Sequence, residues 1–209
     1  MLLVPTLKGY LCSNMKKTRP YHHGNLQEAL LEAAISLISE VGPAGFTLRE
    51  VARRAGVSHN APYRHFRDKD ALLAEVAAQG YKELTKVMVQ AAGRQTDALE
   101  ALKEAGLAYV SFALRRPEHF TVMFDATFSK DLQPAAAEAA EDAFSTLLGL
   151  VKKCQDEGQI AGGDNLDYAL LAWTMVHGIA KLAITQRLPY ASHSKILRFA
   201  RFVIDESLP

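Results

Sequence analysis

The chain has 209 residues, of which 49% are hydrophobic and 22% are charged, and its formal net charge is +1. This balance is typical of an ordinary globular protein and excludes a collagen-like, intrinsically disordered or membrane-embedded chain. The length suffices for one medium domain or for a small domain attached to a larger one.

Cysteines and apolar segments give little sign of secretion or membrane insertion. The sequence contains two cysteines, Cys12 and Cys154, which offer neither a disulfide framework nor a metal-ligand cluster. The opening residues lack the basic segment and continuous apolar run of a signal peptide. The most apolar segment, LLAWTMVHGIA, is too short to span a bilayer. We therefore expect a reducing, cytoplasmic location.

The N-terminal residues 1–14 show neither a helical nor a strand period, whereas a basic cluster begins directly after Met15. Two interpretations stay open. Either the native chain starts at Met15, or residues 1–14 form a disordered extension.

Helical periodicity runs nearly end to end without the sustained alternation of β-strands, so the sequence predicts an all-α fold with about nine helices. The first helix is expected over residues 25–41, because Asn25 and Glu28 have the spacing of a capping box and Gly42 and Pro43 end the pattern. Its expected buried face consists of Leu26, Leu30, Ala33, Leu37 and Val41.

Three further helices are predicted before residue 93. Thr47 and Glu50 repeat the capping box for a second helix, which Gly56 ends. A third, short helix is expected from Ser58, as its N-cap, to about Phe66, and Pro62 near its start limits this helix without forbidding it. Asp68 caps a long fourth helix that extends to about Ala92. Five longer helices are expected over residues 97–115, 117–128, 134–157, 165–187 and 193–207.

The second and third predicted helices have the spacing of a helix-turn-helix, whose second helix enters the major groove of DNA. Residues 1–80 carry ten Lys and Arg against seven Asp and Glu, which favours a polyanionic partner for this part. The outward face of the third helix carries His59, Asn60, Tyr63 and Arg64. Asn pairs with adenine and Arg with guanine, whereas Tyr and His more often hold phosphates. The alternative is a solvated helical hairpin whose charges serve solubility alone.

Lys69 belongs to the same surface. It lies in the first turn of the fourth predicted helix, where the helix dipole also favours an anion. A DNA phosphate at this position would be held by the Lys69 ammonium and by free N–H groups together.

This stretch resembles the DNA-binding domain of the TetR family of transcriptional regulators. The family signature combines T-x-x-x-[IV]-A-x-x-[AG]-G-V-S with Y-x-[HY]-F-x-[DS]-K-x-x-L, and this chain reads TLREVARRAGVS and then YRHFRDKDAL. Pro62 replaces the more frequent Leu before Tyr63, which affects the pitch of the recognition helix. The resemblance implies phosphate contacts for Thr47, Ser58, Tyr63, His65 and Lys69, and base-reading positions for His59, Asn60 and Arg64.

Upstream, KKTRPYHHGN resembles the basic arm found in part of the family. This implies a minor-groove contact for Arg19 and phosphate neutralisation by Lys16 and Lys17. A competing idea is a metal site built from the histidines at positions 22, 23, 59 and 65. Adjacent histidines lack the i, i+4 spacing of a helical site, and neither a carboxylate nor a Cys accompanies them, so we expect no metal and no cofactor.

For the remaining helices the family resemblance implies small-ligand binding and a homodimer. Trp173, His177 and Gly178 also resemble a subgroup that carries a Trp-x-x-x-His-Gly element. Trp173 and His177 lie on one helical face, and Gly178 would allow another helix to approach closely. For His177 two interpretations stay open, a packed core or dimer-interface residue and a ligand contact.

The segment PEHFTVMFDATF supplies aromatic and Met side chains of the kind that line ligand pockets, although such stripes more often form core. The preceding predicted helix adds further aromatic side chains. The default ligand is an apolar or amphipathic molecule. The candidate pocket residues are Tyr109, Phe112, Phe120, Met123, Phe124, Phe128, Trp173 and His177.

Together these features divide the chain into residues 1–18, an uncertain start with a basic arm, residues 19–80, a DNA-binding domain, and residues 81–209, a ligand-binding and dimerisation domain. The predicted function is a repressor that binds a palindromic double-stranded operator as a dimer and is released by a small molecule. A constitutive DNA-binding protein and an all-α enzyme are the alternatives. The enzyme is disfavoured, because the sequence contains neither a nucleophile, base and orienting group at a recognised spacing nor a phosphate-binding Gly loop.

Overall fold

The computed structural model describes residues 26–125 and 133–208, and in these ranges every regular element is a helix, which confirms the all-α prediction. The eight α-helices and the one 3-10 helix, η1, of residues 26–125 and 133–208 correspond in order to the nine predicted helices. No helix in these ranges reaches the combination of length and hydropathy that a bilayer span requires. The bounds are α1 (Leu26–Val41), α2 (Leu48–Arg54), η1 (Pro62–Arg64), α3 (Lys69–Ala92), α4 (Ala98–Arg115), α5 (Pro117–Met123), α7 (Pro134–Asp156), α8 (Asn165–Ile184) and α9 (His193–Ser207).

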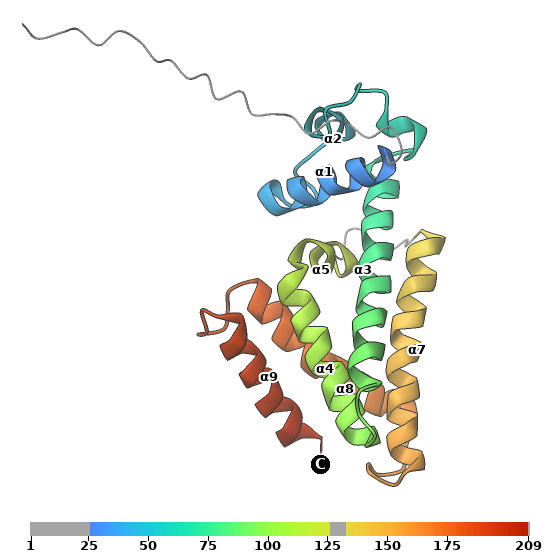
Figure 1. Cartoon of the computed structure of the whole chain (residues 1–209), viewed down its shortest axis with the longest axis vertical. Coiled ribbons are helices and arrows are strands. Elements are labelled where there is room, and N and C mark those ends of the chain that lie inside the picture. The colour runs from blue at the N-terminus through green and yellow to red at the C-terminus, as the bar shows by residue number, and fades with distance from the viewer. Residues whose placement is uncertain (1–25, 126–132, 209) are drawn as a thin grey trace, which may run out of the picture.

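The long helix α3 links the two ends of the molecule (Figure 1). The helices α1, α2 and η1 gather around its N-terminal end, which we call the head, and the helices α4 to α9 pack around the rest of it, which we call the body. Since α3 continues without a break through residue 80, the predicted domain boundary there falls inside a helix and stays a prediction.

Both ends of α2 are fixed by the residues that the sequence marked. At its start, Glu50 N–H donates to Thr47 Oγ1 (3.3 Å) and Thr47 N–H donates to the Glu50 carboxylate (2.7 Å), which completes the capping box. At its end, Gly56 has a φ of +71°, and the N–H groups of Gly56 and Val57 donate to carbonyls of the last turn. This arrangement favours Gly, because other residues are strained at such a φ.

The third predicted helix, from Ser58 to about Phe66, is not an α-helix, and only a 3-10 helix forms within it. Pro62 is the physical reason. In an α-helix residue 62 would donate to the Ser58 carbonyl, but proline has no N–H. That carbonyl accepts the N–H of Ala61 instead (2.9 Å), and Arg64 N–H donates to the Ala61 carbonyl (3.2 Å), both with i to i+3 spacing. Ser58 is therefore not the N-cap, which falls on Ala61 without a side-chain bond.

The head has its own share of the hydrophobic core. Leu30, Val51 and Leu72 are fully buried there, on α1, α2 and α3 respectively. The face predicted for α1 is correct at its centre but wrong at its end. Val41 is 53% exposed, because it is the last residue of α1 and the chain turns away at the following Gly42.

A polar contact ties α1 to α2. Arg54 donates to both carboxylate oxygens of Glu40 (2.5 and 2.6 Å) and to Ser36 Oγ (2.6 Å). These bonds from the guanidinium lower the pKa of the Glu40 carboxyl. Because the pair is exposed to solvent, its main effect is to orient the two helices through bidentate geometry.

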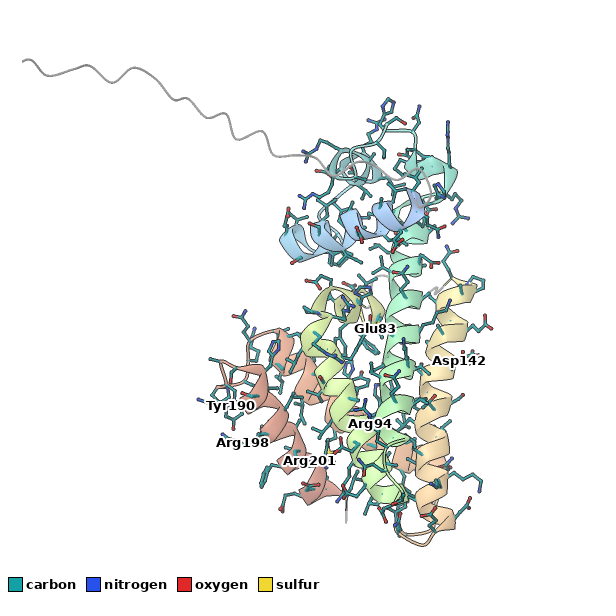
Figure 2. All side chains as sticks on the ribbon, in the orientation of Figure 1. Glu83, Arg94, Asp142, Tyr190, Arg198 and Arg201 are labelled. Carbon is teal, nitrogen blue, oxygen red and sulfur yellow. The ribbon has the colours of Figure 1, made fainter. Side chains whose placement is uncertain are left out.

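In the body, charged side chains connect α9 to α4. Arg201 on α9 forms ion pairs with Glu100 and Glu104 on α4, and Lys103 lies 3.5 Å from Asp205. Figure 2 shows Arg201 on the side of α9 that faces α4. Beneath these pairs, Ile204 is fully buried, so α9 is held by an apolar stripe with an ionic edge.

The start of α3 generates the first prediction. The Asp68 carboxylate accepts Ala71 N–H at 2.8 Å, so Asp68→Ala leaves this donor without its capping partner. Loss of an N-cap costs about 1 kcal/mol, which for a chain of this size lowers the Tm by about 2–4 °C. Thermal unfolding measures the change. Asp68→Ser, which keeps a capping oxygen, should retain most of the stability, and equal melting of all three proteins would contradict the capping role.

Candidate functional site

The described candidate DNA contacts lie between the start of α2 and the start of α3, in the head. Ala61, Pro62 and Phe66 are buried, and the polar side chains between them are turned outward. Tyr63 is 53% exposed, and its hydroxyl has no hydrogen-bond partner among the described residues. Arg19 lies outside the described residues. The exposed candidates are Thr47, Ser58, His59, Asn60, Tyr63, Arg64 and His65, whereas Lys69 is half-buried.

Lys69 is held by the protein itself, a feature that the sequence did not indicate. Its Nζ donates to the Ala44 carbonyl (3.2 Å) and lies 5.4 Å from the centre of the Phe46 ring. At the same helix start, the Asp68 carboxylate already accepts the N–H of Ala71. A phosphate bound here would therefore compete with bonds that Lys69 and this N–H group already make.

Thr47 is similarly engaged in the free protein. Its hydroxyl donates to Glu50 Oε2 (2.9 Å) and accepts the N–H of the same residue. The bonds from the Thr47 hydroxyl and N–H lower the pKa of the Glu50 carboxyl, so the acceptor of the capping box stays ionised near neutral pH.

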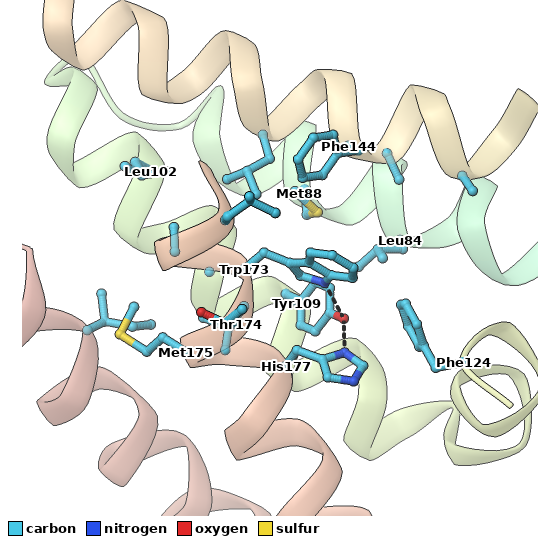
Figure 3. Close-up of a pocket in the computed structure, with 18 of the residues that line it drawn as sticks. Leu84, Met88, Leu102, Tyr109, Phe124, Phe144, Trp173, Thr174, Met175 and His177 are labelled. Atoms are coloured by element: carbon cyan, nitrogen blue, oxygen red, sulfur yellow. Dashed lines mark hydrogen bonds between the residues drawn. The ribbon is translucent and has the colours of Figure 1, made fainter. Parts of the chain in front are cut away.

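A cavity of about 810 Å³ lies in the body among α3, α4, α7 and α8 (Figure 3). Its size is that of small-molecule sites. Among the described residues, no Asp, Glu, Lys or Arg side chain lines it. The wall includes Tyr81, Leu84 and Met88 from α3, Leu102, Gly106 and Tyr109 from α4, Ala140, Ala143, Phe144 and Leu147 from α7, and Leu166, Leu170, Trp173, Thr174 and His177 from α8.

Five of the eight predicted pocket residues line this cavity, namely Tyr109, Met123, Phe124, Trp173 and His177. Phe112 and Phe120 do not line it and are fully buried in the core. The Phe120 ring stacks on the His177 ring with 5.4 Å between centroids, so it supports the wall from behind. Phe128 lies outside the described residues.

Sequence reasoning missed the walls formed by α3 and α7. On α7 the apolar positions 140, 143, 144 and 147 repeat at helical spacing, and this pattern was the signal available for that wall. The sequence alone does not tell which of several apolar helical faces surround a shared space.

Three polar side chains meet on the cavity wall. Trp173 Nε1–H donates to the Tyr109 hydroxyl oxygen (3.3 Å), which lies 2.9 Å from His177 Nδ1 (Figure 3). Burial raises the pKa of the Tyr109 hydroxyl. Burial and the nearby Lys181 cation lower the pKa of the His177 imidazole. Both groups are therefore neutral near pH 7.

The short helix α5 lies against both α1 and α3 and also contributes to the cavity wall. The Tyr81 hydroxyl on α3 donates to the Met123 carbonyl (2.9 Å). At Gly80, an added Cβ would lie 2.5 Å from Met123 Sδ and 3.2 Å from His119 Cβ, so the absent side chain lets α5 approach α3 closely. Met123 therefore lies on the cavity wall and also in the helix that contacts the head.

Metal ligands are not grouped in the part of the chain that the structure describes. No set of three or more His, Cys, Asp or Glu side chains there is arranged to hold an ion. His22 and His23 lie outside this part.

Comparison with known proteins agrees with this architecture. Residues 30–76 match the family described as "Bacterial regulatory proteins, tetR family", and residues 102–206 match "Tetracyclin repressor-like, C-terminal domain". A protein of unknown function from Rhodococcus sp. RHA1 is 34% identical, with a TM-score of 0.77 over 91% of this chain and 99% of that one. The likeness to the Trp-x-x-x-His-Gly subgroup is not tested by these matches and stays a prediction.

Two more distant structures share the fold. A regulatory protein of the tetR family from Rhodococcus RHA1 is 19% identical, with a TM-score of 0.72 over 87% of this chain and 94% of that one. The transcriptional regulator FadR from Bacillus subtilis, solved in complex with stearoyl-CoA, is 16% identical, with a TM-score of 0.74 over 87% and 97% of the two chains.

The second prediction concerns His119 on α5, which is 6% exposed and whose Nδ1 has no hydrogen-bond partner in the described part of the chain. Burial and the Arg116 cation lower the pKa of its imidazole, against the smaller opposing effect of Glu83 and Glu118. In the unfolded chain the His119 imidazole becomes protonated near pH 6.5, whereas in the folded protein it becomes protonated only at lower pH. The stability due to neutral His119 is therefore complete above this pH and is lost as pH falls toward the folded pKa.

His119→Leu should make the free energy of unfolding less dependent on pH, by at most about 1.4 kcal/mol per pH unit. Urea unfolding between about pH 7.5 and about pH 5.5 measures the slope. A residual slope is expected because the pKa of His177 is shifted in the same direction. His193→Leu, at an exposed position, is the matched control. If His119→Leu keeps the full wild-type slope, the pH dependence originates elsewhere.

Proposed function

The chain belongs to the TetR family of transcriptional regulators and is thus a DNA-binding regulator, and from this premise we propose that it is a ligand-released repressor acting on a palindromic operator as a homodimer. The observation that carries the proposal is the course of α3. It begins at Lys69, among the candidate DNA contacts, and further along it lines the cavity with Tyr81, Leu84 and Met88.

This course supports a direct mechanical connection between ligand and DNA. An α-helix of 24 residues is about 36 Å long and moves as one body. A ligand releases the operator if it binds more tightly to one position of α3 than to another, because the two heads of a dimer then change their spacing. The contact of α5 with α1 offers a second connection, since Met123 and Phe124 line the cavity next to it.

The candidate DNA contacts divide by chemistry into two sets. Asn60 and Arg64 have side chains that pair with base edges, and His59 lies beside them. The remaining candidates are suited to the DNA backbone, which supplies most of the salt-dependent affinity. They are Thr47, Ser58, Tyr63, His65 and Lys69, together with Arg19, whose minor-groove contact remains a prediction.

The effector we propose is a small apolar or amphipathic molecule. The apolar cavity supports it, as does the stearoyl-CoA complex of FadR, a protein of the same fold. A DNA-binding protein without an effector is the alternative, and operator affinity that no cavity ligand alters would favour it.

An exposed apolar surface on α8 and α9 supports the homodimer. Leu171, Leu182 and Phe202 are 51%, 46% and 60% exposed. Gly178 shares the α8 face with the two leucines, and a Cβ added there would meet nothing within 4 Å in this chain. Within the described residues, no other helix makes the close approach to Gly178 that the sequence predicted. A helix of a second copy could pack there. Apolar surface of this kind is typical of an interface between subunits.

The third prediction tests the DNA surface. Once an operator has been selected from a random duplex library, Tyr63→Phe should weaken binding about tenfold, because a hydrogen bond to a charged phosphate contributes about 1.5–3 kcal/mol. Its Tm should be unchanged. Lys69→Ala should weaken binding too, but with a lower Tm, since it also loses the bonds to Ala44 and Phe46. Fluorescence anisotropy with labelled operator measures the affinity.

Phe124→Ala is the opposite control, because it enlarges the cavity and leaves the head intact. It should bind operator like the wild type and alter only the response to a cavity ligand. Wild-type operator affinity in both Tyr63→Phe and Lys69→Ala would remove the support for this DNA surface.

The fourth prediction concerns the dimer. Leu171→Glu combined with Phe202→Glu places charges on the proposed interface and should give a monomer with at least about tenfold weaker operator binding. Sedimentation velocity measures the oligomeric state. Val89→Glu, at a 52% exposed position on α3, is the matched control and should remain dimeric. A dimer that survives the double substitution would place the interface elsewhere.

A further inference from the structure

The hydrogen bonds on the cavity wall have a defined direction, because each group has a limited number of protons. The Trp173 indole can only donate, so the Tyr109 oxygen accepts its bond. The Tyr109 hydroxyl then has one proton of its own, and His177 Nδ1 lies 2.9 Å away.

The opposite direction would leave a buried donor without an acceptor. If Nδ1–H donated to Tyr109, the hydroxyl proton would need another acceptor, and the described residues provide none. Tyr109 is 4% exposed, and an unsatisfied buried donor is costly. The Tyr109 hydroxyl therefore donates to Nδ1, and the neutral His177 ring carries its proton on Nε2.

This Nε2–H group differs from the other polar groups of the wall. The Tyr81 hydroxyl already donates to the Met123 carbonyl, and the Thr174 hydroxyl donates to the carbonyl of Leu171 in its own helix. His177 lines the cavity, and its Nε2 has no hydrogen-bond partner among the described residues. Among the described residues that line the cavity, His177 Nε2 is thus the polar side-chain nitrogen or oxygen without a hydrogen-bond partner.

We propose that His177 Nε2–H binds a hydrogen-bond acceptor of the effector, and that the effector is an uncharged, largely apolar molecule with a carbonyl, ether or hydroxyl oxygen. This inference rests on the proposed function of the cavity as the effector site. The described lining residues include no Lys, Arg, Asp or Glu, so a carboxylate or an ammonium group in the cavity would lose hydration without an ion-pair partner on the wall, which is costly. Tyr109 is the positioning residue. Its hydroxyl proton occupies the acceptor nitrogen Nδ1 of His177, so the neutral ring keeps its own proton on Nε2.

Four probes with a common phenyl and alkyl body test this chemistry on the full-length protein. Butyrophenone carries a carbonyl acceptor, butylbenzene has none, phenylbutyrate is an anion and phenylbutylamine is a cation. Calorimetry gives the affinities. Trp173 is the single Trp of the chain, so its fluorescence reports whether a probe occupies the cavity.

In the wild type, we expect phenylbutyrate and phenylbutylamine to bind at least about tenfold more weakly than butyrophenone. In His177→Phe, the affinity ratio of butyrophenone to butylbenzene should fall about tenfold, because the apolar wall remains and one hydrogen bond is lost. Tyr109→Phe should lower this ratio about threefold, since the ring of His177 is no longer held in one tautomer. A purely structural role of Tyr109 would change both affinities alike. His193→Phe, the same kind of substitution outside the cavity, should keep the wild-type ratio.

The possible failures are distinguishable. An unchanged ratio in His177→Phe, or tighter binding of phenylbutyrate than of butyrophenone, would overturn the inference and leave the cavity as an effector site. If none of the probes binds the wild type, both the inference and the effector site of the proposed function are contradicted.

Discussion

The continuity of α3 is the constraint on which the rest of the structure depends. Near its start Leu72 and Val76 are fully buried, and further along Leu84 and Met88 line the cavity. Since the backbone hydrogen bonds of a helix link each turn to the next, the head cannot shift relative to the cavity without moving α3 or bending it. The start of α3 is fixed by the Asp68 cap, and Gly80 removes the side chain that would otherwise hold α5 away. The described contacts between the two ends therefore include α3 itself and α5, which touches both α1 and α3.

The body combines an apolar interior with a small number of buried polar groups, and their hydrogen bonds determine what the cavity presents. The Tyr81 hydroxyl is satisfied by the Met123 carbonyl, and the Tyr109 hydroxyl is satisfied by Trp173 and His177. Because both of these hydroxyl groups are paired, they offer a ligand little beyond apolar contact, and the His177 Nε2 has no partner among the described residues. The aromatic rings around His177 add to this restriction, with the Phe124 ring centroid at 4.6 Å.

The helix α8 serves two surfaces at once. Trp173 and His177 face the cavity, whereas Leu171 and Leu182 lie on a neighbouring face that is open to solvent in the single chain. Leu166 and Leu170 contribute to both surfaces, because they line the cavity and are also partly exposed to solvent. A second copy packed on α8 would thus lie close to the ligand site. In the proposed dimer, a change at one of these surfaces would therefore alter the packing of the helix that forms the other.

The sequence by itself determined the features that depend on neighbours within one helical turn. The capping box of Thr47, the turn at Gly56 and the cap at Asp68 all occur where the sequence places them, because their hydrogen bonds join residues two to five positions apart. The helix-turn-helix pattern and the family signature were recognisable because their residues also lie close together in the sequence. The prediction of an α-helix from Ser58 to Phe66 was wrong, because Pro62 removes an N–H donor from a short segment.

The tertiary structure decided which apolar faces enclose a space and which polar groups meet. Phe112 and Phe120 pack in the core, whereas Leu84 and Phe144, from helices far apart in the sequence, line the same cavity. Likewise, Tyr109 and His177 are 68 residues apart in the sequence, yet their side chains share a hydrogen bond. Apolar periodicity records that a helix face is buried but not what it is buried against, since the hydrophobic effect has no direction and the packing of whole helices sets the partners.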